Sequence, residues 1–127
     1  MVDLDHFKRV NDRFGHPVGD NVIRSTAAIL LQSCRGGDLV ARFGGEEFIL
    51  LLPNTTTEQA QHVAERCRIA LTELNFVYEQ QPFSISASFG ISSSQNASEP
   101  QQIIRQADQA LYAVKTAGRN QVQIYCK

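Results

Sequence analysis

Residues 42–52, RFGGEEFILLL, place two glycines and two glutamates directly before an unbroken apolar run. Paired glycines between apolar segments are typical of a hairpin turn, so we expect strands at residues 39–43 and 48–52. A hairpin turn does not require two adjacent carboxylates beside a buried strand. Spacing alone leaves Glu46 and Glu47 open to two interpretations, as solvated turn residues or as groups with a chemical role.

The composition indicates one globular domain without a strongly charged partner. The 127 residues carry 12 basic and 13 acidic side chains, a net charge of −1. This balance argues against nucleic acid or direct membrane contact, because both partners favour a basic surface. The three cysteines include no CxxC pair, which indicates buried thiols in a reducing compartment. With no transmembrane-length run and no signal peptide, we expect a cytoplasmic domain, or the cytoplasmic end of a membrane-anchored chain.

The periodicity of the rest of the chain predicts four helices and three further strands. The helices are expected at residues 7–14, 16–34, 55–74 and 100–118. The further strands are expected at residues 1–5, 83–91 and 121–125. The order β-α-α-β-β-α-β-α-β indicates an α+β fold, with helices flanking an antiparallel-rich sheet. The opening residues MVDLD resemble the second half of a strand, so we expect a fragment of a longer chain, truncated at its N-terminus.

Two carboxylates from different strands are expected to meet. If the hairpin pairs beside the opening strand, Asp3 and Glu46 converge at one edge of the sheet. Clustered carboxylates repel one another and lose solvation, so they need cations, and oxygen ligands suit Mg²⁺ or Mn²⁺. Two such ions activate an attacking hydroxyl and stabilise a leaving pyrophosphate. The alternative is solvated turn acids, and spacing alone leaves the two interpretations evenly balanced.

Asn11 is a polar residue at an apolar position. It follows Phe7 by four residues, on the apolar face of the first expected helix. A core-facing amide needs partners, and it offers both a donor and an acceptor to a guanine edge. On their own, Asn11 and Asp20 favour simpler interpretations, as an internally satisfied amide and a favourable charge at a helix N-terminus.

Four segments carry a specific resemblance: VDLDHFKRVNDRFGHPVGD, RGGDLVARFGGEEF, SFGIS and ADQALYAVKTAGRN. Together, and in this order, they resemble the GGDEF family of diguanylate cyclases in its GGEEF form, over nearly the whole chain. The resemblance implies one domain over residues 1–127, lacking the family's leading helix and the first half of its first strand. It also implies a nucleotide-cyclase or polymerase-palm-like fold with a ferredoxin-like core. The implied reaction condenses two GTP into cyclic di-GMP and releases two pyrophosphates.

The resemblance implies two Mg²⁺ or Mn²⁺ ions per active site. Asp3 and Glu46 would bind them, assisted by the carbonyl of Leu4. Glu46 would also help to deprotonate the attacking 3′-hydroxyl. Glu47 is the secondary candidate for catalysis and for metal binding.

The implied substrate site divides into a base end and a phosphate end. Asn11 and Asp20 fall on the guanine-binding positions, and the carboxylate can accept from N1 and N2, which adenine does not satisfy. Glycines in the turn allow close approach of a nucleotide. The full set of implied substrate-binding residues is Phe7, Lys8, Asn11, His16, Asp20, Gly44, Gly45, Lys115 and Arg119.

The segment RGGD at residues 35–38 has the RxxD pattern of the family's product-inhibition site. The planar, forked guanidinium group of arginine can bind a phosphate group and can stack on guanine. The resemblance implies that Arg35, Asp38 and Arg66 bind cyclic di-GMP. The alternative is a surface loop and a solvated arginine.

The implied partners follow from the reaction. Each domain binds one GTP, so ring closure requires a homodimer, and a sensor domain is expected in a parent chain. The competing interpretation is a non-catalytic receptor for cyclic di-GMP or GTP, which the RxxD pattern serves equally well. A polymerase palm is disfavoured because finger and thumb segments and a basic surface are lacking.

Overall fold

A short buried strand organises the sheet. The computed structural model describes residues 1–126. Strand β1 (Val2–Leu4) pairs antiparallel with β3 (Glu47–Leu51) on one side and with β6 (Ala87–Ile91) on the other. The strand order is β2-β3-β1-β6-β7, with β2 (Leu39–Gly44) and β7 (Val122–Ile124) at the edges. β7 runs parallel to β6, while the other pairs of this sheet are antiparallel. The predicted antiparallel-rich α+β fold is therefore confirmed.

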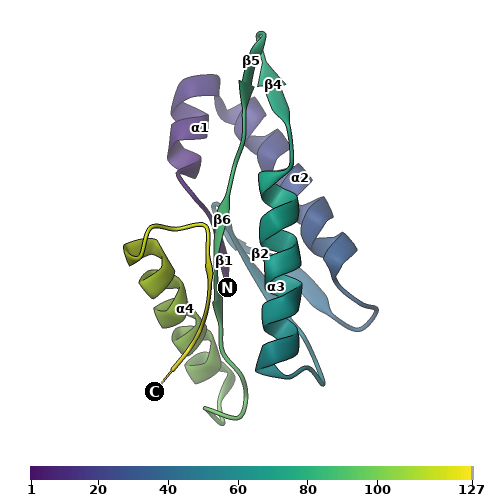
Figure 1. The fold of residues 1–127 in the computed structure, drawn as a ribbon, viewed down its shortest axis with the longest axis vertical. Coiled ribbons are helices and arrows are strands. Elements are labelled where there is room, and N and C mark those ends of the chain that lie inside the picture. Colours follow the sequence, from purple (N-terminus) through teal and green to yellow (C-terminus); the bar gives the residue numbers. More distant parts are fainter. Residues whose placement is uncertain (127) are drawn as a thin grey trace.

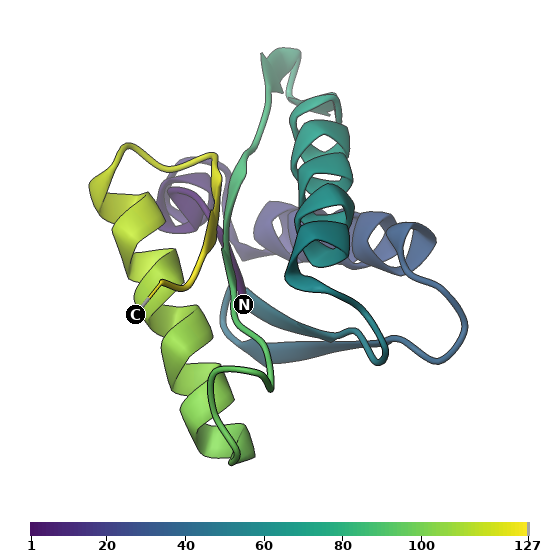
Figure 2. The ribbon, with the colours of Figure 1, turned by 60° about the horizontal axis from the view of Figure 1, so that its bottom comes forward.

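Helices cover both faces of the sheet. α2 (His16–Ser33) and α3 (Thr57–Thr72) lie on one face, and α4 (Pro100–Thr116) lies on the other (Figures 1 and 2). α1 (Phe7–Phe14) packs against α2. The larger apolar core lies between the sheet and the α2–α3 layer, and it includes Val22, Leu30, Phe48, Leu71 and Phe89.

The α4 layer packs directly on the backbone of β6. A Cβ atom on Gly90 would lie 2.2 Å from the carbonyl oxygen of Ala107 and 2.5 Å from the amide nitrogen of Leu111. Only glycine permits so close an approach of helix and strand. This contact packs the middle of α4 against β6.

The strand predicted at residues 83–91 is wrong in its extent, because the structure divides this segment. β5 (Gln81–Phe83) pairs with β4 (Phe76–Tyr78) in a separate hairpin, and β6 begins only at Ala87. The division follows from the length of β1, whose ladder with β6 ends at the pair Leu4–Ala87. Beyond the bond from the Asp5 N–H to the Ser86 carbonyl oxygen the β1 segment turns away, and residues 81–83 pair with β4 instead.

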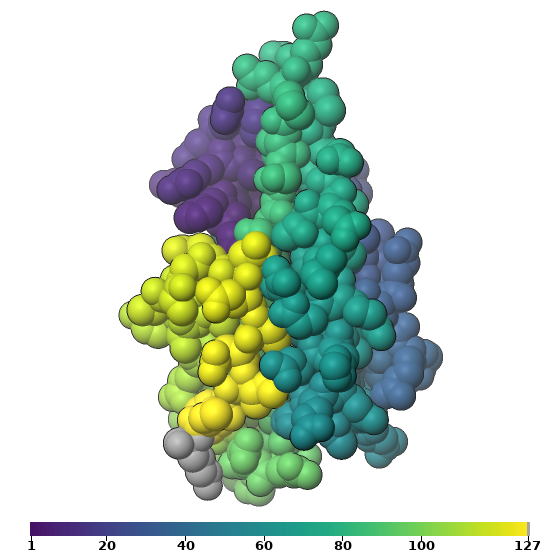
Figure 3. Space-filling view, in the orientation of Figure 1, coloured from purple at the N-terminus to yellow at the C-terminus, as the bar shows by residue number. Residues whose placement is uncertain are grey.

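The additional hairpin is anchored by aromatic side chains. Phe83 stacks on Phe14 at a centroid distance of 4.4 Å and on Phe76 at 5.2 Å. The hairpin projects from the body of the protein, at the top of the space-filling view (Figure 3). Of the helices in residues 1–126, none is both long and apolar enough to cross a membrane.

Candidate functional site

A cavity of about 440 Å³ gathers most of the predicted substrate-binding residues. Its walls come from α1, from the start of α2 and from the β2–β3 turn. The lining residues are Phe7, Lys8, Asn11, His16, Asp20, Arg42, Gly45 and Glu46. Seven of these eight residues were predicted from the sequence, and Arg42 was not. The cavity has an amide and a carboxylate at its α1–α2 end and a carboxylate at its turn end.

Close packing of α1 on α2 shapes the α1–α2 end of the cavity. A Cβ atom on Gly19 would lie 1.9 Å from Oδ1 of Asn11 and 3.2 Å from the ring of Phe7. The absent side chain at Gly19 therefore leaves the space that the Asn11 amide occupies. Asp20 follows directly on α2, so the amide and the carboxylate face the same cavity.

Arg42 fixes the glycine turn. Its Nε and Nη2 atoms donate to the carbonyl oxygen of Gly45 at 2.9 and 2.6 Å. Gly45 has a φ of +29°, a backbone conformation that side chains rarely adopt. The backbone of Glu46 is held from the other side, because the Leu4 N–H donates to the Glu46 carbonyl oxygen at 3.2 Å. A cation two residues before paired glycines is the sequence signal that would have pointed to Arg42.

Asp3 lies beside this turn in an ion pair. Lys115 Nζ, from the last turn of α4, donates to Asp3 Oδ2 at 2.5 Å, and the Asp3 side chain is only 8% exposed. Burial raises the pKa of Asp3 above its ordinary value, and repulsion from Glu46 and Asp5 adds to the rise. Lys115 opposes this rise without cancelling it. Burial alone would lower the pKa of Lys115, but the hydrogen bond and charge of Asp3 raise it.

Glu47 belongs to the same acidic group. It is the cross-strand partner of Asp3 in the β1–β3 ladder. Burial raises the pKa of Glu47, and the charge of Asp3 raises it further. Asp3, Glu46 and Glu47 thus experience one another's charge, so the predicted meeting of carboxylates from β1 and the hairpin is present.

The donor set suits a hard divalent cation. Within residues 1–126, no three acidic, histidine or cysteine side chains gather closely enough to form a metal cage from protein ligands alone. Mg²⁺ characteristically binds through one or two carboxylates together with water and substrate phosphates. Carboxylates whose pKa values are raised by burial, and further by mutual repulsion, gain from such a cation. The residues therefore fit a metal site in which the protein supplies some of the ligands and phosphate groups supply others.

Four further predicted residues do not line the cavity. Leu4 and Lys115 contact the turn and Asp3 respectively, as described above. Gly44 ends β2, directly before the lining residue Gly45. Arg119 lies in the turn after α4, and its Nη1 donates to the Lys115 carbonyl oxygen at 3.5 Å.

The residues predicted for product inhibition form a separate group. The Arg35 N–H donates to Asp38 Oδ2 at 2.8 Å, so the RxxD loop closes on itself. Arg66 Nη2 donates to the Ser33 carbonyl oxygen at 3.2 Å, at the C-terminal end of α2. The cavity lies at the other end of this helix of 18 residues. At the rise of an α-helix, that length separates the two groups by about 25 Å.

Comparison with known proteins identifies the family of this domain. The family model described as "Diguanylate cyclase, GGDEF domain" matches residues 1–121. The chain belongs to the GGDEF family. This domain is 42% identical to Diguanylate cyclase DgcP of Pseudomonas aeruginosa over 124 residues, which is 98% of the chain but only 18% of DgcP.

Solved structures agree with the fold of this GGDEF domain. The active GGEEF domain of a diguanylate cyclase from Vibrio cholerae is 37% identical, with a TM-score of 0.91 over 99% of this chain and 80% of that one. The GGDEF domain of DgcB from Caulobacter crescentus, in complex with c-di-GMP, is 30% identical, with a TM-score of 0.92 over 98% of this chain and 74% of that one.

The contact between Gly19 and Asn11 generates a prediction. Gly19→Ala should leave the domain folded while rotating the Asn11 amide out of the cavity, because the new methyl group occupies its place. The side-chain NH₂ resonances of Asn11 in a ¹⁵N-labelled NMR spectrum measure this change. Gly36→Ala is the matched control, because nothing lies within 4 Å of a Cβ at that position. Unmoved Asn11 resonances in the Gly19→Ala protein would contradict the packing described.

Proposed function

We propose that this domain synthesises cyclic di-GMP by condensing two molecules of GTP. The cavity carries the argument, because it joins a guanine-compatible pair, Asn11 and Asp20, to the acidic turn at Glu46. A carboxylate acceptor and an amide match the N1, N2 and O6 edge of guanine. The family membership supports this reaction, because the relative DgcP is named a diguanylate cyclase.

Each part of the cavity has a role in this proposal. Asn11 and Asp20 orient the base, with His16 beside them. The backbone at Phe7 and Lys8, where α1 begins, accommodates phosphates, because free N–H groups and the helix dipole favour anions there. Gly44 and Gly45 admit the nucleotide close to the turn. Lys115 and Arg119 supply cations at the phosphate end.

Glu46 is the proposed catalytic group. It lines the cavity and lies beside the buried Asp3, so it can accept the proton of a 3′-hydroxyl placed at the turn. Asp3, Glu46 and the Leu4 carbonyl would hold two Mg²⁺ or Mn²⁺ ions, with Glu47 assisting. When bound, the metals neutralise developing negative charge on the phosphates.

Ring closure requires two copies of the domain. A cavity of about 440 Å³ suits one nucleotide, and it is built from a single set of lining residues. A second GTP therefore comes from a facing domain. The chain spans 18% of the length of DgcP, and a sensor segment in a parent chain would bring two such domains together.

Arg35, Asp38 and Arg66 are proposed to bind the product. Two guanidinium groups and a carboxylate gather here, because Arg66 bonds to the carbonyl oxygen of Ser33, two residues before Arg35, and the Arg35 N–H bonds to Asp38. Arginine forks bind phosphate and Asp38 accepts from guanine. The same group would serve a non-catalytic receptor, which is the alternative function.

The activity itself is the first test. With GTP and Mg²⁺, we expect cyclic di-GMP to form at a rate per domain that increases with protein concentration. Glu46→Gln should lower that rate at least about 100-fold, because the proton acceptor is lost. Glu58→Gln, at an exposed glutamate on α3, is the control. Product separation by chromatography measures the rate. A folded protein that forms no product at any concentration would favour the receptor function instead.

Metal binding has a separate test. Mg²⁺ should tighten binding of a non-hydrolysable GTP analogue by about tenfold, because the cation bridges phosphates and carboxylates. Asp3→Asn should remove most of this gain, while Asp12→Asn, on the exposed face of α1, should retain it. Titration calorimetry with and without chelator measures the gain. An equal Mg²⁺ effect in both variants would exclude Asp3 as a ligand.

Product binding provides a further prediction. Arg35→Ala should weaken cyclic di-GMP binding by about tenfold or more and leave the uninhibited rate unchanged, because a charged hydrogen-bond donor is lost far from the cavity. Arg24→Ala, at an exposed position of α2, is the matched control. If Arg35→Ala binds the product as tightly as the unmodified domain does, the assignment of this group is wrong.

A further inference from the structure

The turn between α4 and β7 has an unusual backbone. Gly118, Arg119 and Asn120 have φ values of +115°, +68° and +50°, so three consecutive residues are left-handed. Glycine and asparagine tolerate this region, whereas arginine does so only at a cost in free energy. Such a conformation persists where surrounding contacts determine it. The turn carries Arg119 and directly follows the helix end that carries Lys115.

The β-sheet holds the turn from one side. The Asn120 N–H donates to Asp5 Oδ2 at 3.0 Å and to Ser88 Oγ at 3.2 Å. Asp5 also accepts from the hydroxyl groups of Ser86 and Ser88, each at 2.6 Å. Asp5 is 9% exposed and directly follows β1, which carries Asp3. A buried carboxylate with three donors is a fixed anchor for the backbone of the turn.

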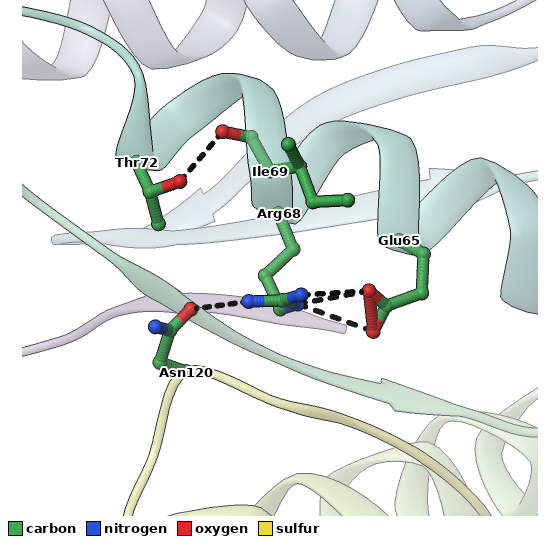
Figure 4. A network of polar contacts seen from close by, with 5 residues as sticks. All are labelled: Glu65, Arg68, Ile69, Thr72 and Asn120. Carbon is green, nitrogen blue, oxygen red and sulfur yellow. Dashed lines mark hydrogen bonds and ion pairs between the residues drawn. The ribbon is translucent and has the colours of Figure 1, made fainter.

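Helix α3 holds the turn from the other side. Arg68 Nη1 donates to Asn120 Oδ1 at 3.1 Å, across 52 positions of the sequence (Figure 4). The turn and the C-terminal strand lie against α3 on the molecular surface (Figure 3). The amide of Asn120 therefore joins α3 to the turn that carries Arg119.

A carboxylate orients Arg68 for this contact. Arg68 Nε lies 3.1 and 3.0 Å from the two carboxylate oxygens of Glu65, and Nη2 lies 2.9 Å from Oε2 (Figure 4). Glu65 thus occupies one edge of the guanidinium, and the Nη1 atom remains directed at Asn120. The planar fork of arginine makes both contacts at once, whereas a lysine ammonium lacks this geometry.

We propose that Arg68 is a positioning residue for the phosphate end of the nucleotide site. Acting through Asn120, it fixes the left-handed turn, and so the placement of Arg119 and of the α4 end that carries Lys115. This inference rests on the proposed GTP site. It assigns a role in substrate binding to a residue of α3, which lies on the opposite face of the sheet from α4.

The proposal predicts a loss that depends on the number of phosphates. Asn11 and Asp20, on α1 and α2, are the proposed base-binding residues. Neither is among the partners of Asn120 described above. Loss of Arg68 should therefore weaken binding of a nucleotide with three phosphates and spare one with a single phosphate. A general loss of structure would weaken both equally.

Titration calorimetry of the folded domain with a non-hydrolysable GTP analogue and with GMP tests this. Arg68→Ala should weaken the analogue by about tenfold, the effect of one charged hydrogen bond, and change GMP less than twofold. Arg68→Lys keeps the charge and most of the stem and should show the same selective loss, so it decides the matter if Arg68→Ala fails to fold. Arg105→Ala, at an exposed arginine of α4, should leave both affinities unchanged.

Asn120 offers a matched pair of variants. Asn120→Asp keeps the acceptor for Arg68 and should retain both affinities. Asn120→Gly keeps the left-handed backbone, removes the acceptor, and should reproduce the selective loss of Arg68→Ala. In the Asn120→Gly background, Arg68→Ala should add no further loss, since both changes break one contact.

Three results would overturn the proposal. Unchanged affinity for the analogue in Arg68→Ala or Arg68→Lys, with the unmodified domain binding it, would reject the role of Arg68 alone. Equal losses for the analogue and GMP would show a general structural role. Failure of the unmodified domain to bind the analogue would reject the proposed function, and this inference with it.

Discussion

The backbone pairing of β1 is the constraint on which the rest of the domain depends. Its three residues are buried, and they bond to β3 and β6 at once. The same strand presents Asp3 to α4 and is followed by Asp5, which anchors the turn after α4. Fold and site therefore share one segment. A change that displaces β1 alters the central ladder, the acidic group and the turn after α4 together.

Much of the fold was predictable because local sequence patterns determine it. The four helices have apolar periodicity and clear ends, such as the capping box of Thr56 and Gln59 at the start of α3. The β4–β5 hairpin was missed because its turn residues, Glu79 and Gln80, adopt positive φ without the usual glycine or asparagine. The break before β6 was missed because it depends on where β1 ends, which no local pattern records.

The candidate site was predictable to the extent that its residues belong to motifs. Seven of the cavity's eight lining residues lie in the quoted segments at positions with an implied role. Arg42 lies within such a segment, but its bonds to the Gly45 carbonyl depend on the turn geometry. The contact of Arg68 with Asn120 joins residues 52 positions apart, and neither side chain signals the other in the sequence. Long-range polar contacts of this kind emerge only from the packing of whole elements.

The position of α2 limits how its two ends can influence each other. The cavity lies at the start of the helix and the RxxD group at its end, about 25 Å away. Physiological salt screens exposed charges over about 8 Å, so the charge of a ligand at one end is hardly felt at the other. A helix is stiff along its axis, however, and a shift or tilt at one end moves the other end as well. Any coupling between the two ends must therefore be mechanical, and its strength would depend on how firmly α2 is packed against α1 and α3.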